Sequence, residues 1–310
     1  MTTLLPFLLS LPFLPITSTT PTSTLNIAAH QDDTILFQSP SLIRSLHFLT
    51  TNTTAQSPKS PRHLTIFLTA GDAGNTSTYW LSRESGIRAS YATMLSAPNT
   101  WIESSTDAEV PGHSVAMFTL STYPVSLAFL RLPDGFLDGR GFERTGNRSL
   151  RRLWDGEVQS LQALAVDGLG EDGGREGGGK GEVYTNETVV SVLGGLVRAF
   201  KPEVVSLQNY KSGEGDHSDH FYGARFAREA VRWAFPDYDS GSGSGEGGVK
   251  VIGYVGYPVI ERPENVRGEE LEEKNAAFYA YAKHDWMTCE SDEDCVGKYE
   301  VRWLTREYTI

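Results

Sequence analysis

The sequence has little positive charge, only two cysteines and no long apolar run. Its 310 residues include 27 Lys and Arg against 39 Asp and Glu, which gives a formal net charge of −12. Proteins that bind nucleic acids present a basic surface to the phosphates, and clusters of Lys and Arg attract anionic membranes. The sequence contains no such cluster, so we expect no nucleic-acid partner. A neutral substrate such as a sugar is compatible with this charge.

The most apolar stretch lies near the N-terminus. Leu4–Ile16 is a run of thirteen residues without a charge, whereas a membrane-spanning helix needs about 20 apolar residues. The polar sequence TSTTPTST follows, as in a signal-peptide cleavage zone, although no Lys or Arg precedes the run. We expect residues 1–24 to be a signal peptide with a polar leader, and the mature protein to be secreted without a stable membrane span. The alternatives are a disordered leader, a short membrane anchor, or a location in the lumen or membrane of the endoplasmic reticulum.

Cysteine usage and glycosylation motifs agree with secretion. Cys289 and Cys295 lie in the segment CESDEDC, and a pair this close in an oxidising compartment predicts a local disulfide. The alternative is a metal site, but a single C-x5-C pair lacks the second pair of ligands. Four N-x-[ST] sequons, the acceptors of N-linked glycans, are Asn52, Asn75, Asn147 and Asn186.

Apolar segments of strand length alternate along the chain with segments of helical periodicity. The expected strands are Leu25–Ala29, Leu64–Thr69, Val125–Leu132, Glu203–Leu207 and Val249–Val255. The expected helices are Ile35–Leu49, Arg83–Leu95, Val189–Phe200 and Phe221–Phe235. This alternation predicts an α/β fold of three layers, with a mainly parallel sheet covered by helices on both faces.

Two Gly-rich segments interrupt this pattern. Residues 167–182 and 239–248 are too rich in glycine to bury a core, and they are typical of flexible loops. The strand and helix pattern resumes after each of them. We therefore expect residues 25–310 to form a single domain with two loop insertions.

Polar residues gather after two of the expected strands. The segment 29–33 (AHQDD) follows the first strand, and the segment 216–220 (DHSDH) follows EVVSL after a short loop. Ligands of open α/β sheets bind beyond the carboxyl ends of the strands. Together the two segments supply three histidines and several carboxylates, which suit a zinc site in a hydrolase. Helix capping and surface polarity are the alternatives. A dinucleotide site is disfavoured, because no G-x-G-x-x-G follows the first strand.

These motifs resemble those of the PIG-L/LmbE-like zinc-dependent N-deacetylases. The segment 30–33 (HQDD) is similar to the family signature AHPDDE, and 217–220 (HSDH) is similar to its HxDH signature. The segments 68–74 (LTAGDAG) and 83–84 (RE) also look like this family. The resemblance covers about residues 25–255, with a weaker similarity at 274–281. It implies a Rossmann-like α/β fold and, with the N-terminal leader, a secreted branch related to N-acetylglucosaminylphosphatidylinositol de-N-acetylase.

The resemblance also implies roles for single residues. The zinc ligands it implies are His30, Asp33 and His220. Asp32 corresponds to the general base that activates the hydrolytic water. His217 corresponds to the residue that stabilises the oxyanion or protonates the leaving amine. Asp219 corresponds to a residue that orients His217. Zinc is the expected cofactor, although His and Asp ligands accept other divalent ions.

The sequence departs from the signature at two positions and offers further candidates near it. Gln31 replaces the proline, which alters the turn, and Thr34 replaces the final glutamate, which could remove a substrate contact. Candidate substrate-binding residues are Arg83, Asp134 and Asp72; their alternatives are a solvated helix residue for the first and turn residues for the other two. Tyr79 and Trp80 could stack on a sugar ring, although aromatic residues more often pack in a core.

We therefore expect a metal-dependent hydrolase that removes the N-acetyl group of an N-acetylglucosamine-type amino-sugar or glycoconjugate and releases acetate. A metal hydrolase of another amide or ester is the first alternative. A secreted carbohydrate-binding protein on a degenerate deacetylase scaffold is the second, and the complete set of His and Asp residues disfavours it. The sequence leaves the aglycone and the oligomeric state open.

Overall fold

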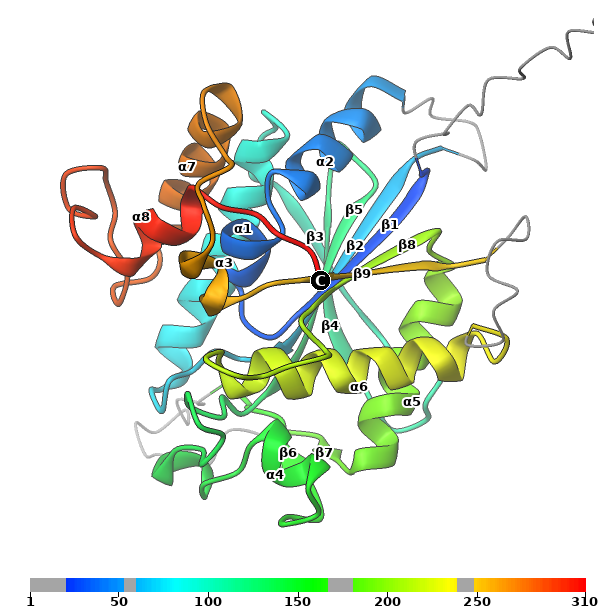
Figure 1. Ribbon diagram of the computed structural model, residues 1–310. Coiled ribbons are helices and arrows are strands. Elements are labelled where there is room, and N and C mark those ends of the chain that lie inside the picture. Colours follow the sequence, from blue (N-terminus) through cyan, green and yellow to red (C-terminus); the bar gives the residue numbers. More distant parts are fainter. Residues whose placement is uncertain (1–20, 53–59, 167–180, 239–247) are drawn as a thin grey trace, which may run out of the picture.

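A computed structural model describes residues 21–52, 60–166, 181–238 and 248–310. Most of the expected signal peptide and of both Gly-rich insertions lies outside these ranges, so the structure does not test these predictions. Within them the chain forms a seven-stranded sheet and a two-stranded sheet (Figure 1). The strands are β1 (Ser23–Ala28), β2 (Arg62–Thr69), β3 (Trp101–Thr106), β4 (Val115–Leu120), β5 (Val125–Leu132), β6 (Leu161–Gln162), β7 (Val183–Tyr184), β8 (Val204–Gln208) and β9 (Lys250–Tyr254).

The large sheet is mainly parallel, as predicted. Its strand order is β3-β4-β5-β2-β1-β8-β9. The five neighbouring strands β5, β2, β1, β8 and β9 pair in parallel. From β1 the chain proceeds through β2 to β5 on one side, and it later crosses to β8 and β9 on the other side. The strand order thus reverses between β1 and β8, where doubly wound sheets bind ligands. The strands β3 and β4 add an antiparallel edge that sequence reasoning did not predict.

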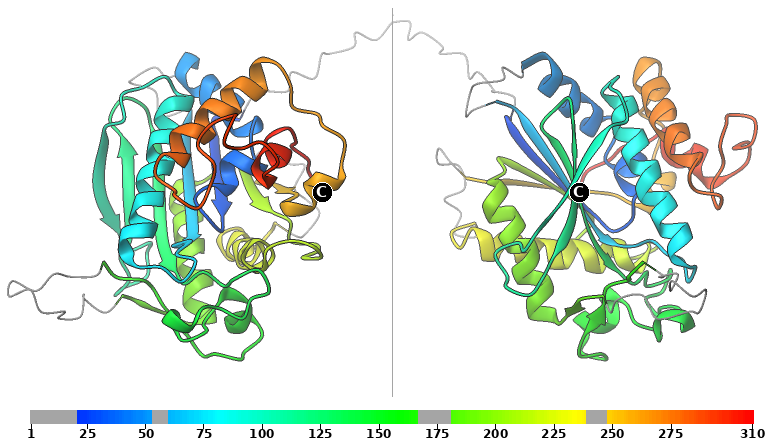
Figure 2. Two further views of the ribbon diagram at one scale, coloured as in Figure 1. Left: turned by 90° about the vertical axis from the view of Figure 1, so that its left-hand side faces the viewer. Right: turned by 180° about the vertical axis from the view of Figure 1, so that it is seen from behind.

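Helices cover both faces of the sheet (Figures 1 and 2). One face carries α4 (Leu150–Trp154), α5 (Asn186–Phe200) and α6 (Ser218–Ala234). The other face carries α1 (Asp33–Phe37), α2 (Ser41–Asn52), α3 (Ser77–Met94) and α7 (Glu269–Ala282), with α8 (Tyr299–Leu304) beside them. The short 3-10 helices are η1 (Glu143–Thr145) and η2 (Tyr257–Glu261). Within the described ranges no helix is long and apolar enough to cross a bilayer.

Alternate side chains of the strands supply the two cores between these layers. Ile66 and Leu68 of β2 pack with the core under α5 and α6, whereas Phe67 packs with the core under α1, α3 and α7. This period of two follows from strand geometry, and a sheet buried on both faces needs apolar residues at both sets of positions. The three-layer α/β prediction is therefore confirmed.

Local sequence explains where helix predictions and structure differ. The expected helix Ile35–Leu49 is divided into α1 and α2, and Pro40, which has no amide N–H to donate, stands between them. The helix expected from Arg83 begins earlier, at Ser77, with Thr76 as its N-cap residue. The predicted disulfide between Cys289 and Cys295 is present, and both cysteines are buried.

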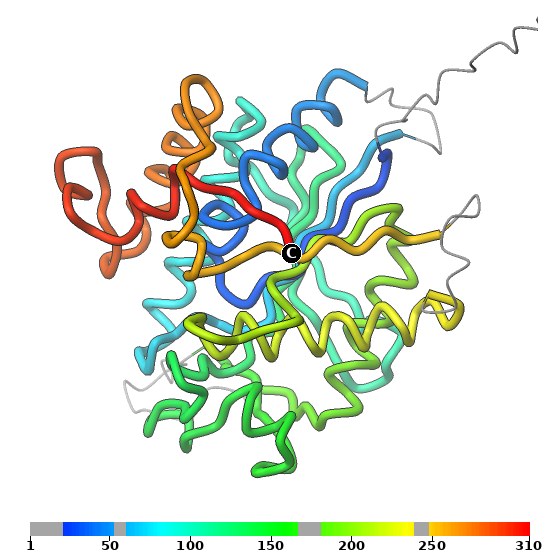
Figure 3. Tube along the Cα trace, in the orientation of Figure 1, coloured from blue at the N-terminus to red at the C-terminus, as the bar shows by residue number. Residues whose placement is uncertain are grey.

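A buried lysine joins α7 to the C-terminal part of the chain. The Nζ atom of Lys274 donates to the carbonyl oxygens of Leu36 (2.8 Å) and Arg306 (2.9 Å). Lys274 is fully buried, and burial lowers its pKa to about 7. This side chain therefore connects α1, α7 and the segment after α8, which Figure 3 shows returning toward β9.

We expect Lys274→Met to lower the free energy of unfolding by about 2–4 kcal/mol, because a buried carbonyl left without a donor costs about 1–3 kcal/mol. Methionine nearly preserves the packed volume, so the hydrogen bonds are what the substitution removes. Urea unfolding followed by circular dichroism measures the change. The matched control is Lys283→Met at the exposed end of α7. Equal stability of the two variants would show that the hydrogen bonds of Lys274 do not stabilise the fold.

Candidate metal centre

The turn after β1 brings two aspartates and a histidine to the switch point. The Asp33 carboxylate accepts a hydrogen bond from the backbone N–H of His30 (2.6 Å), which closes the turn as α1 begins. Gln31 is fully buried, and its amide donates to the carbonyl oxygen of Ala70 (3.0 Å) in the loop after β2. Gln31 in place of proline therefore ties this turn to the neighbouring loop.

The start of α6 brings two further histidines to the same place. His217 is the N-cap residue of α6, and its Nδ1 accepts the backbone N–H of Asp219 (3.1 Å). In the neutral imidazole the proton is therefore on Nε2. His220 lies one turn further into the helix; its Nδ1 lies 2.7 Å from Asp216 Oδ1 and its Nε2 lies 2.9 Å from Asp33 Oδ1. The two motifs, almost 190 residues apart in sequence, thus meet across β1 and β8.

Three buried histidines form the centre of this cluster. The potential ligand atoms of His30, His217 and His220 all lie within 4.8 Å of one another. A second such group consists of His30, Asp134, His217 and Asp219. The Nε2 atom of His220 lies 2.9 Å from Asp33 Oδ1 and that of His30 lies 3.4 Å from Asp219 Oδ2, but neither contact has the geometry of a hydrogen bond. Imidazole and carboxylate groups that face one another at this spacing suit a zinc-type divalent ion, which both kinds of group can bind.

The carboxylates give the cluster a strongly negative potential. Burial opposes the charge on His220, but Asp33 and Asp216 outweigh burial and raise its pKa to about 10. Burial also opposes the charge on His30, yet Asp33 and Asp219 raise its pKa well above the usual range. Positive charge, carried by protons or by a metal ion, is therefore strongly favoured here.

Asp32 lies beside Arg83. Its Oδ1 accepts a hydrogen bond from Arg83 Nη2 (2.7 Å), and the side chain is 23% exposed. Burial raises the pKa of Asp32, against the opposing effect of Arg83. Arg83 is itself buried and also donates to the carbonyl oxygen of Gly71 (2.7 Å). The alternative of a solvated arginine on the helix surface is thus excluded, and the guanidinium fixes the orientation of Asp32.

Asp134 and Asp72 come from the loops after β5 and β2. The Asp134 carboxylate lies 3.8 Å from His30 Nε2 and 3.9 Å from His217 Nε2. Asp72 is fully buried, and it accepts the backbone N–H of Asp134 (2.9 Å). Burial raises the pKa of Asp72 to about 6. Asp72 therefore shapes the loop that carries Asp134, and substrate contacts by these residues and Arg83 stay predictions.

Asp219 lies within the cluster, but its carboxylate does not hold His217. Its Oδ2 accepts the backbone N–H of Gly135 (2.7 Å) and lies 3.4 Å from His30 Nε2. A Cβ atom at position 135 would lie 2.4 Å from Asp219 Oδ1, so a larger residue there would displace this carboxylate. His217 is instead held by the backbone of Asp219, as described above.

Sequence reasoning did not assign a role to Asp216. The structure pairs its carboxylate with His220 and also with the backbone N–H groups of His217 (2.9 Å) and Tyr257 (3.0 Å). Burial opposes ionisation, but the neighbouring His220 holds the pKa of Asp216 below its usual range. The signal in the sequence was the spacing, because residues four apart at a helix start share one face.

The sequons differ in exposure. Asn75 is partly buried, and its side-chain nitrogen lies 3.8 Å from the sulfur of Met287. The other three, which lie on the exposed surface, are Asn52, Asn147 and Asn186. Glycosylation at these positions stays a prediction.

No family model matches the chain, and no curated protein matches it significantly. Solved structures resemble its fold at a distance. N,N′-Diacetylchitobiose deacetylase from Pyrococcus horikoshii is 11% identical with a TM-score of 0.45, and the match covers 91% of this chain and 76% of that one. 4-Carboxy-2-hydroxymuconate hydratase from Pseudomonas putida is 13% identical with a TM-score of 0.43, and the match covers 91% of this chain and 83% of that one. Teicoplanin deacetylase Orf2 is 14% identical with a TM-score of 0.41, and the match covers 91% of this chain and 90% of that one. These likenesses are too distant to assign an activity, which we infer from the site.

Proposed function

We propose that the chain is a metal-dependent N-deacetylase of the PIG-L/LmbE type. It hydrolyses the N-acetyl group of an N-acetylglucosamine-type amino-sugar or glycoconjugate and releases acetate. The observation that carries this proposal is the cluster of three buried histidines, whose ligand atoms lie within 4.8 Å of one another beside several carboxylates. Its position at the switch point of the sheet, where β1 and β8 end, further supports a ligand site.

The metal is held by His30, Asp33 and His220. These residues converge in the structure, with Asp33 Oδ1 2.9 Å from His220 Nε2 and Asp33 Oδ2 3.4 Å from His30 Nδ1. The chemistry that zinc, or another divalent ion, supplies when bound is polarisation of a carbonyl and a lowered pKa for water. Asp134 lies across the cluster and is available to accept hydrogen bonds from sugar hydroxyls.

Asp32 is the general base. Its carboxylate is partly exposed and pairs with Arg83, whereas the carboxylate of the neighbouring Asp33 lies against His220 and His30. Arg83 holds one carboxylate oxygen, so that the other is free to accept a proton from the attacking water. Burial raises the pKa of Asp32, which increases its basicity once ionised.

His217 stabilises the oxygen that becomes negative as water attacks. Burial, together with the charges of His30 and His220, lowers its pKa to about 3, so the ring is neutral. Because Nδ1 accepts a backbone N–H, the proton on Nε2 is donated toward the substrate. The new C–O bond forms, the C–N bond breaks, and the amine leaves with the proton that Asp32 took from water.

We also propose that the protein acts outside the cytoplasm. The support consists of the apolar leader, the sequons and the Cys289–Cys295 disulfide, which persists in oxidising compartments. This proposal concerns location only, and the chemistry of the site does not depend on it.

The test is product analysis with oligomers of N-acetylglucosamine. We expect acetate and free primary amine in equal amounts, because one C–N bond is cleaved for each acetate released. Faster cleavage of an O-acetyl ester, with no amine formed, would favour the alternative of an ester hydrolase. Binding of the oligomer without any product would favour the carbohydrate-binding protein.

A separate prediction concerns the pairing of Asp216 with His220. We expect Asp216→Asn to weaken metal binding about 10- to 100-fold, because carboxylates that hold a ligating histidine have effects of this size. Competition with a chelator measures the dissociation constant. The matched control is Glu214→Gln, an exposed residue in the same loop. Unchanged metal affinity in Asp216→Asn would show that this pairing is not needed.

A further inference from the structure

An exposed tryptophan follows α7 near the candidate site. Trp286 is 60% exposed, whereas the other strongly exposed tryptophan, Trp233 on α6, is 41% exposed. Large aromatic rings are usually buried, because exposing them to water costs free energy. A ring this exposed, if it is also held rigidly, is suited to bind a ligand.

The residue beside it anchors the ring to the fold. Asp285 is buried, and its carboxylate accepts hydrogen bonds from the hydroxyl groups of Tyr79 (2.8 Å) and Tyr281 (2.6 Å). The same carboxylate accepts the backbone N–H of Met287 (3.1 Å), which fixes the chain on the far side of Trp286. The Trp286 ring packs against the Tyr79 ring, with centroids 4.6 Å apart.

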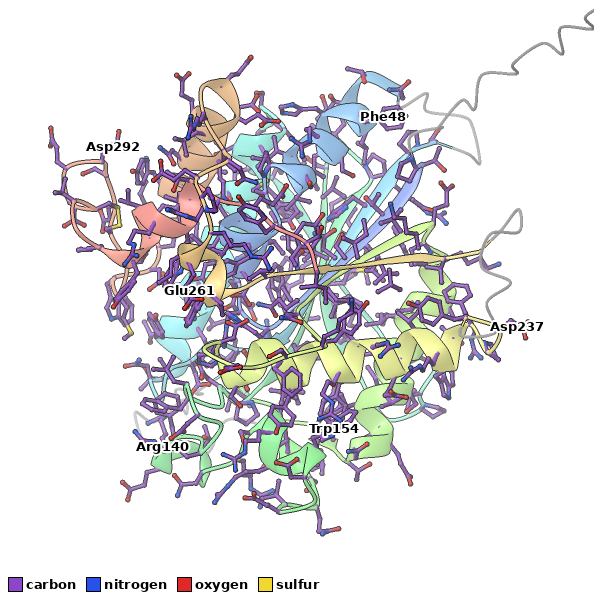
Figure 4. All side chains as sticks on the ribbon, in the orientation of Figure 1. Phe48, Arg140, Trp154, Asp237, Glu261 and Asp292 are labelled. Carbon is purple, nitrogen blue, oxygen red and sulfur yellow. A yellow bond between two sulfur atoms is a disulfide. The ribbon has the colours of Figure 1, made fainter. Side chains whose placement is uncertain are left out.

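The rest of the segment is fixed as well. Ser82 of α3 donates to the carbonyl oxygen of His284 (2.6 Å), and the Cys289–Cys295 disulfide closes the loop that follows. Figure 4 marks this loop with Asp292, which projects from the body of the molecule beside α7 and α8. Ligand binding to Trp286 would therefore require little ordering of the chain.

The anchor also connects Trp286 to the proposed base. Arg83 binds Asp285 (Nε to Oδ2, 3.0 Å) on one side and Asp32 on the other. Met287, also 60% exposed, contacts Asn75 in the loop after β2. Trp286 is thus linked to Asp32 by a short chain of contacts through Tyr79, Asp285 and Arg83.

We propose that Trp286 binds a second sugar ring, so that the substrate is a saccharide chain rather than a single amino-sugar. An aromatic face matches the apolar C–H face of a pyranose, and Tyr79 supports it from behind. The acetamido-bearing sugar lies at the histidine cluster while its neighbour packs on the indole. This inference rests on the proposed deacetylase function and adds an extended binding surface to it.

The test compares binding of N-acetylglucosamine with binding of its β-1,4-linked tetramer by isothermal titration calorimetry. Both are measured on the full chain with its metal, in an Asp32→Asn background that slows turnover. We expect Trp286→Ala to weaken tetramer binding about tenfold more than monomer binding, which corresponds to about 1.4 kcal/mol. Trp286→Phe retains much of the aromatic face and should lose less.

The matched control is Trp233→Ala, which removes an exposed tryptophan from α6 and should leave the ratio of the two affinities unchanged. Equal losses for tetramer and monomer in Trp286→Ala would overturn the proposal, as would a parent protein that binds both equally. A change in the molecular mass of the protein in solution, with unchanged saccharide affinity, would also overturn it and assign Trp286 to a contact between proteins.

Failure of this inference can be separated from failure of the proposed function. Acetate release from the tetramer without any dependence on Trp286 would support the proposed reaction and contradict sugar binding by Trp286. Binding of the tetramer that depends on Trp286, without acetate release by the wild-type protein, would support sugar binding by Trp286 and contradict the proposed reaction.

Discussion

Asp32→Asn is expected to reduce acetate release about 10²- to 10⁴-fold, the usual contribution of a general base, while the protein retains its metal. Asparagine has the same shape and can still accept a hydrogen bond from Arg83 through its oxygen. It cannot take a proton from water at neutral pH. Since Asp32 pairs with Arg83 and is not one of the proposed ligands, the metal content should not change.

The control for this substitution is Asp107→Asn, in an exposed turn after β3. It removes the same charge without touching the cluster, so its activity and metal content should equal those of the wild type. Full activity in Asp32→Asn would show that another group takes the proton. Loss of metal in Asp32→Asn would instead place Asp32 among the ligands.

The double substitution His30→Ala/His220→Ala is expected to abolish metal binding and acetate release together. It removes two of the three proposed ligands and leaves the carboxylate of Asp33 without its imidazole partners. A single carboxylate does not hold a zinc-type ion in a closed site. Metal analysis of the purified protein measures the loss directly.

Folding must be measured in the same samples, because both histidines are buried. Circular dichroism and thermal unfolding show whether the double variant retains the fold. The control is His47→Ala on α2, a partly exposed histidine away from the cluster. A folded double variant with wild-type metal content would place the metal elsewhere in the protein.

The sequence predicts the position of the site because parallel topology constrains it. Segments 29–33 and 216–220 each follow a strand, and the carboxyl ends of parallel strands lie at one edge of the sheet. Once the apolar runs are read as parallel strands, the meeting of His30 with His217 and His220 follows. The layers follow as well, since such a sheet must be covered on both faces.

Contacts between distant segments could not be predicted in this way. Arg83 and Asp285 are 202 positions apart by number, and nothing in either local pattern indicates their ion pair. The same applies to Trp286 and Tyr79. Strand β3 was missed because it is mostly exposed and lacks the apolar alternation that indicates a strand.

The measurement that tests metal-dependent deacetylation most directly is acetate release from N-acetylglucosamine oligomers by one protein sample in three states. The sample is assayed as purified, after complete chelation, and after zinc is restored, with the metal content determined each time. We predict that acetate release falls to background on chelation and returns with about one bound ion per chain, as expected for one site with three protein ligands. Acetate release that persists unchanged in metal-free protein, or none from fully loaded protein, would contradict the proposed function.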